Sequence, residues 1–88
     1  MTAEECLEVL ESCGYKRNGM GGISGKSKGV DFTVCEHMFK GICVMGHSVS
    51  KDGRSVSDIE EYVQVKNLNK VSFAGWFCSI IDKYSYAD

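Results

Sequence analysis

Two apolar stretches rich in β-branched residues, 30–35 and 42–45, most constrain the fold of this chain. They read VDFTVC and ICVM, and the short segment between them ends in Lys40-Gly41, a pair that could turn the chain back. Runs of this kind, bounded by glycine, are typical of paired strands. We therefore expect residues 30–36 and 41–48 to form the antiparallel centre of a sheet.

The first residues predict a helix over 3–13. Thr2 and Glu5 have the spacing of a capping box, in which two side chains satisfy the first free amides of a helix. Apolar residues then recur at helical spacing: Cys6, Leu7, Leu10 and Cys13. Gly14 can adopt the left-handed conformation that ends a helix.

A second helix is expected from Ser72, a residue type that favours the N-cap position. Its apolar residues fall within an arc of about 160°: Phe73, Trp76, Phe77, Ile80, Ile81 and Tyr84. The arc is wider than one sheet contact needs. We therefore expect Trp76 or Ile81 to lie at its edge, available to a partner or, in a homodimer, to the C-terminal helix of a second copy.

The segments between these elements are harder to interpret. Residues 16–29 are rich in glycine and follow no periodicity, so we expect a mobile loop in which only Ile23 suits an edge strand. Asp52-Gly53 indicates a hairpin that would place Val49 opposite Val56. A short helical turn remains an alternative for residues 49–61, and the alternation of residues 62–66 favours a third strand.

This order of elements predicts a single small α+β domain over residues 1–88. We expect a two-layer sandwich, with a sheet of three to four antiparallel strands and both helices on one face. A net charge of −2 gives no general reason to bind nucleic acid or a membrane, and no apolar run approaches the length of a membrane span. The N-terminal segment does not resemble a signal peptide, so a cytoplasmic protein is expected.

The five cysteines are an odd number, and we expect them to be reduced and packed as small apolar side chains in or near the core. Cys35, His37, Cys43 and His47 are nonetheless metal-ligand types close together in sequence. Their spacing matches no common zinc pattern, and a two-residue turn between the strands would put His37 and Cys43 on opposite faces, whereas a longer loop would restore the arrangement. We expect no metal and no cofactor, and keep a small zinc module as an alternative.

No stretch carries a recognisable catalytic pattern. Gly25-Lys26-Ser27 lacks the earlier glycine of a phosphate-binding loop, and strand-like residues follow it in place of a helix. Cys35 and His37 would share a strand face about 7 Å apart, too far for direct proton transfer. We therefore expect that the protein is not an enzyme.

Charge is segregated along the chain. Glu4, Glu8 and Glu11 share one side of the first predicted helix, and we interpret them as an acidic stripe for a basic partner. Four cations follow among glycines: Lys16, Arg17, Lys26 and Lys28. As an alternative, these cations would bind nucleic acid or another polyanion, although four charges are few for such binding at physiological salt.

Together these features predict a non-enzymatic module that binds a larger protein as a small inhibitor or adaptor. On size class alone, the group we expect it to join is that of phage or mobile-element inhibitors, such as anti-CRISPR proteins. The expected contact residues are the acidic stripe, Asp52 in the predicted Asp52-Gly53 turn, and Trp76 or Ile81.

Overall fold

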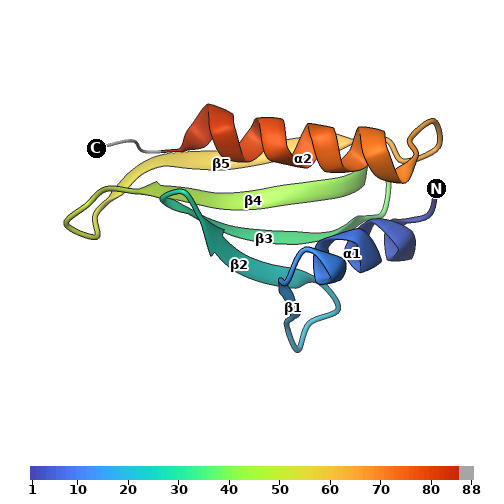
Figure 1. Cartoon of the computed structure of the whole chain (residues 1–88), viewed down its shortest axis with the longest axis horizontal. Coiled ribbons are helices and arrows are strands. Elements are labelled where there is room, and N and C mark those ends of the chain that lie inside the picture. The colour runs from blue at the N-terminus through green and yellow to red at the C-terminus, as the bar shows by residue number, and fades with distance from the viewer. Residues whose placement is uncertain (86–88) are drawn as a thin grey trace.

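Five antiparallel strands form one sheet, and two helices cover the same face of it (Figure 1). The computed structural model describes residues 1–85. In chain order the elements are α1 (Ala3–Ser12), β1 (Lys16–Arg17), β2 (Ile23–Ser27), β3 (Val30–His37), β4 (Gly41–Val49), β5 (Ser55–Val63) and α2 (Lys70–Tyr84). The strands lie in their sequence order, so β1 and β5 are the edges. The expected α+β class with both helices on one face is confirmed, with five strands in place of three to four.

Capping boxes begin both helices. At α1 the Glu5 amide donates to the Thr2 hydroxyl (3.1 Å) and the Thr2 amide donates to the Glu5 carboxylate (2.8 Å), as the sequence predicted. At α2 the cap is Asn69, whose side chain accepts from the Ser72 amide at 2.9 Å. The expected N-cap at Ser72 is therefore wrong, because its hydroxyl serves the third helical position of the box.

Residues 16–29 form two strands, so the expected mobile loop is wrong, although Ile23 does begin a strand. Lys28 and Gly29 have φ values of 50° and 76°, and they connect β2 to β3 as a two-residue hairpin turn. The Asn18 side-chain oxygen accepts the amides of Met20 (2.9 Å) and Gly22 (3.0 Å), which fixes the β1–β2 turn.

Phe32 lies at the centre of the core because glycine stands beside it on both neighbouring strands. It pairs with Gly25 on β2 and with Gly46 on β4. A Cβ at Gly25 would lie 3.0 Å from the Phe32 ring, so the ring occupies the space of the missing side chain. The rings of Tyr15 and Phe77 meet Phe32 edge to face, with centroids 5.1 Å away in each case.

Residues 49–61 form a hairpin, which decides between the two alternatives and shows the helical turn to be wrong. The chain turns at Asp52-Gly53, where Gly53 has a φ of 87°. Val49 pairs with Ser55 and not with Val56, because the register shifts next to Val49. The strand expected over residues 62–66 is wrong in its bounds, since β5 ends at Val63.

Candidate interaction site

The face of the sheet turned away from the helices is uncovered in residues 1–85 (Figure 1). Strand alternation and register place mainly polar residues there: Ser24, Lys26, Asp31, Thr33, Cys35, His37, Cys43, Met45, His47, Asp58, Glu60 and Tyr62. A polar sheet face of this kind is an ordinary solvated surface. The feature that departs from an ordinary surface is the turn at one end of it.

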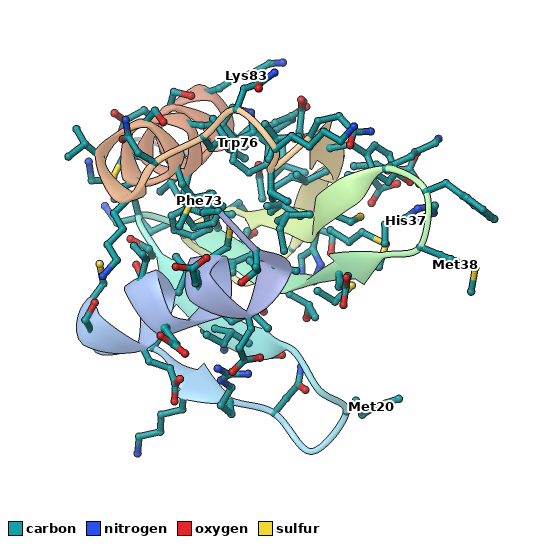
Figure 2. All side chains as sticks on the ribbon, turned by 90° about the vertical axis from the view of Figure 1, so that its right-hand side faces the viewer. Met20, His37, Met38, Phe73, Trp76 and Lys83 are labelled. Atoms are coloured by element: carbon teal, nitrogen blue, oxygen red, sulfur yellow. The ribbon has the colours of Figure 1, made fainter. Side chains whose placement is uncertain are left out.

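Two large apolar side chains stand exposed in the turn between β3 and β4. Met38 is 85% exposed and its neighbour Phe39 is 80% exposed. Figure 2 shows Met38 projecting away from the body of the protein at the end of this hairpin. We call residues 38–40 the hairpin tip.

Hydrogen bonds hold the backbone of the hairpin tip in one shape. The His37 Nδ1 atom accepts the amides of Phe39 and Lys40, both at 3.2 Å. The Gln64 side-chain amide, just beyond the end of β5, donates to the Phe39 carbonyl oxygen at 3.3 Å. Gly41, with a φ of 82°, lies where a Cβ would be 2.2 Å from a β5 carbonyl oxygen, so glycine is required there.

Tyr62 supports the base of the hairpin tip. The His37 ring meets it edge to face with centroids 5.4 Å apart, and the Lys40 ammonium lies 4.4 Å from its ring centroid. Burial raises the pKa of Tyr62, with the Glu60 charge a further cause. The contacts of His37 and Lys40 with the Tyr62 ring therefore link the hairpin tip to β5.

This arrangement suits insertion into a concave partner. Burying a Phe or Met side chain contributes about 1.5–3 kcal/mol, and a tip already fixed in shape loses little conformational freedom on binding. From the sequence, residues 38–40 are predicted only as part of a turn and not as a contact site. The sequence feature that could have indicated a contact site is the Met38-Phe39 pair, because hairpin turns normally carry polar residues or glycine.

One cation pairs with the acidic stripe on α1 and compensates one of its three negative charges. Arg17 on β1 approaches the carboxylates of Glu4 (2.6 Å) and Glu11 (3.0 Å). The hydrogen bond from Arg17 lowers the pKa of Glu4. Glu8 is exposed and has no ion pair within residues 1–85, so it is the one residue of the stripe that Arg17 does not contact.

The remaining predicted contact residues do not meet on one surface. Ile81 is 4% exposed and packs in the core, so its expected exposure is wrong. Trp76 is half-buried beside Phe73, with ring centroids 6.1 Å apart. Asp52 is exposed but accepts from the Arg54 guanidinium at 3.1 Å, and its turn lies at the opposite end of the molecule from α1 (Figure 1).

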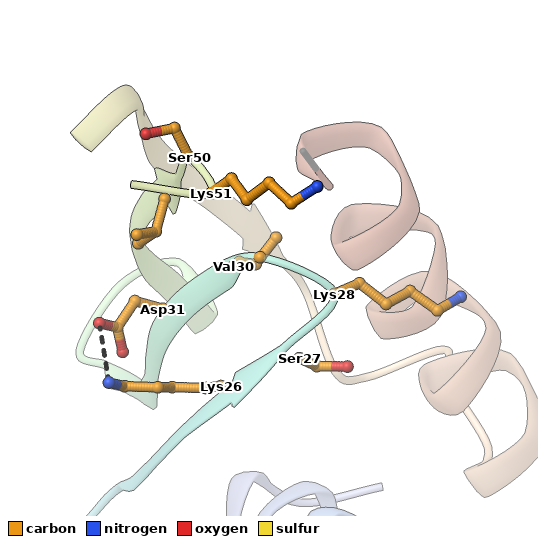
Figure 3. Close-up of a pocket in the computed structure, with 9 residues that line it drawn as sticks. Lys26, Ser27, Lys28, Val30, Asp31, Ser50 and Lys51 are labelled. Atoms are coloured by element: carbon orange, nitrogen blue, oxygen red, sulfur yellow. Dashed lines mark ion pairs between the residues drawn. The ribbon is translucent and has the colours of Figure 1, made fainter. Parts of the chain in front are cut away.

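The predicted cations also fail to form a single patch. Figure 3 shows a hollow at the end of the sheet in which Lys26 approaches Asp31 (3.9 Å), while Lys28 and Lys51 extend toward α2. Lys28 reaches Asp82 on α2 at 2.9 Å. With Arg17 bound to α1, only Lys16 of the four lacks an acidic partner in the part of the chain that the structure describes.

The four metal-ligand types lie on one sheet face, so the two-residue turn that would separate His37 from Cys43 is wrong and the longer loop is present. The turn has three residues between His37 and Gly41, which puts Cys35 directly opposite Cys43. His47 lies four residues further along β4. Within residues 1–85 no group of three or more Cys, His, Asp or Glu side chains has an arrangement that could hold a metal ion.

The thiols are all free but differ widely in exposure. Cys6 and Cys43 are buried, and Cys35 is half-buried. Burial raises the pKa of Cys6 to about 11 and raises that of Cys43 as well. Cys13 and Cys78 are exposed, so the expectation that every cysteine lies in or near the core is wrong for these two.

Comparison with models of protein families, with curated proteins and with solved structures gave no match. Neither helix in the described residues is long and apolar enough to cross a membrane.

Proposed function

We propose that this protein is a protein-binding module that inserts its hairpin tip into a pocket of a larger protein. The observation that carries the proposal is the pairing of two exposed apolar side chains, Met38 and Phe39, with a backbone fixed by His37 and Gln64. Clustered aromatic and Met side chains on a rigid element are the usual anchors of protein interfaces.

The shape and charge of the hairpin tip define the pocket that fits it. The tip is convex and narrow, so the complementary surface is an apolar hollow. Lys40 stands beside the apolar pair, which favours an acidic group at the rim of that hollow. Action as an inhibitor or adaptor, and a cytoplasmic location, stay predictions from the sequence.

The other candidate functions have less support. Binding to a polyanion is less favoured because three of the four cations that it would use pair with acidic side chains of the protein itself. A homodimer through the C-terminal helix is less favoured because Ile81, one of its expected contact residues, is buried. Neither alternative uses the exposed Met-Phe pair.

Capture experiments with matched variants test the proposal. Tagged wild-type protein is compared with a Met38→Ser/Phe39→Ser variant and with Met20→Ser, which changes a 92% exposed methionine in the β1–β2 turn. We expect a partner retained by wild type and by Met20→Ser in the presence of nuclease and chelator, and lost with the double variant. A partner that the double variant retains would contradict the proposal.

A further inference from the structure

The free edge of β5 is a second surface that the hairpin tip does not explain. At the opposite edge β1 has only two residues, whereas β5 runs over nine, and nothing in residues 1–85 pairs with its outer side. Natural edge strands are usually protected by proline, lysine or short length. β5 has neither proline nor lysine and is not short, so its protection against self-pairing rests on its acidic side chains and on the register shift beside Val49.

The alternation of hydrogen bonds across the sheet shows which backbone amides and carbonyls of β5 face outward. The Val49 amide donates to the Gly29 carbonyl (2.7 Å), so the odd-numbered residues of β4 bond to β3 and the even-numbered ones to β5. Through the β4–β5 register, Asp58, Glu60 and Tyr62 direct their amides and carbonyls away from the sheet. Their side chains lie on the uncovered face.

The negative charge along the β5 edge indicates which kind of strand would pair with it. Asp58 and Glu60 are exposed and alternate along the strand on the same face as the outward backbone groups. Two copies of β5 pairing with each other would bring these carboxylates together, which destabilises a strand pair. An incoming strand with Lys or Arg at alternate positions meets them favourably.

We propose that the β5 edge binds an extended basic segment of another protein as a sixth, antiparallel strand. Backbone hydrogen bonds to Asp58, Glu60 and Tyr62 supply the pairing, and alternating cations supply the selectivity. This inference does not depend on the hairpin tip. The two surfaces are nonetheless adjacent, since Gln64 just after β5 bonds to Phe39.

A synthetic peptide, acetyl-Thr-Lys-Val-Lys-Val-Lys-Thr-amide, tests the proposal. In the proposed register the three lysines lie opposite Asp58, Glu60 and Tyr62, each in a hydrogen-bonded pair, so two of them face carboxylates. The lysine amides then point at β5, while the valine amides point to solvent. N-methylation of the lysine amides is therefore expected to abolish binding. N-methylation of the valine amides, with equal charge and size, is expected to leave it intact.

Amide hydrogen exchange measured by NMR supplies the site-specific readout. In the free protein we expect fast exchange at Asp58, Glu60 and Tyr62 and protection at Ile59 and Glu61. The peptide is expected to slow exchange at the first three. Equal binding of the two methylated peptides, or protection elsewhere, would overturn the strand pairing.

Charge reversal separates this surface from the others. Asp58→Lys/Glu60→Lys is expected to weaken peptide binding more than about tenfold, whereas Glu8→Lys/Glu36→Lys, with the same change in net charge on exposed sites elsewhere, leaves it unchanged. Phe39→Ala is also expected to bind the peptide normally, so failure of the tip proposal and failure of this one are distinguishable. Unchanged binding by the β5 variant, or no binding by wild type, would overturn the inference.

Discussion

Single residues decide how closely the strands approach in this sheet. Gly46 on β4 has a φ of 154°, and a Cβ there would lie 2.0 Å from the Asp31 carbonyl oxygen on β3. No rotamer relieves that contact, because both atoms belong to the backbone or are fixed to it. The glycine is therefore a packing requirement.

Replacing this glycine tests the close approach. Gly46→Ala is expected to lower the free energy of unfolding by about 3 kcal/mol, because β3 and β4 must separate. Gly75→Ala is the matched control: nothing lies within 4 Å of its added Cβ in α2, so a gain of about 0.5–1 kcal/mol is expected. Urea unfolding measures both, and equal effects would contradict the packing argument.

Thiol reactivity follows from burial at each cysteine. At pH 8 we expect Cys13 and Cys78 to react quickly with iodoacetamide, and Cys6 and Cys43 to react only on unfolding. The raised pKa of Cys6, about 11, keeps it in the unreactive thiol form. Peptide mass mapping after timed quenching measures the rates, and rapid alkylation of Cys6 in the folded protein would refute this assignment.

At the scale of elements, one carboxylate joins α2 to β5. Glu61 accepts from the Tyr84 hydroxyl at 2.5 Å and pairs with the Lys83 ammonium at 3.2 Å. The Tyr84 hydrogen bond, and then Lys83, lower the pKa of Glu61. Its stabilisation is therefore present at neutral pH and is lost as the pH falls through the lowered pKa.

The pH dependence of a Glu61 variant checks this link. Glu61→Gln is expected to cost about 1 kcal/mol of unfolding free energy at pH 7, and the difference from wild type should vanish once the pH falls below the lowered pKa of Glu61. Glu36→Gln, at an exposed position with no ion pair in residues 1–85, is expected to match wild type throughout. A Glu61→Gln deficit that persists at low pH would rule out an ionic origin.

The shape of the hairpin tip depends on the His37 acceptor. His37→Phe keeps an aromatic ring against Tyr62 but removes the Nδ1 atom that accepts two amides. We expect faster motion of the Phe39 and Lys40 amides and weaker partner binding, because an unfixed tip loses more entropy on docking. NMR relaxation measures the motion, and unchanged order parameters would show that His37 does not fix the tip.

The sequence predicted elements whose signals are local. The capping box and apolar periodicity placed α1, and the β-branched runs placed β3 and β4. β1 and β2 were missed because Gly, Ser and Lys have little strand preference of their own. Gly25 belongs to a strand because the Phe32 ring from the next strand covers it, which is a contact that periodicity does not reveal.

At the scale of the whole molecule, long-range contacts reassign the predicted site. Arg17 pairs with two residues of the acidic stripe only because β1 packs beside α1. Ile81 is buried because α2 packs on the sheet through a wide part of its apolar arc, and Ile81 lies within that part. The chemistry of these side chains was evident in the sequence, but their partners were set by the fold.

The most direct test of binding through the hairpin tip is site-specific photo-crosslinking. p-Benzoylphenylalanine is placed at Phe39 in one protein and at Met20 in another, both highly exposed turn positions. In a lysate of the source cells, we predict one adduct of defined mass from position 39, blocked by excess unlabelled wild type, and none from position 20. Equal adducts at both positions, or none at position 39, would contradict the account.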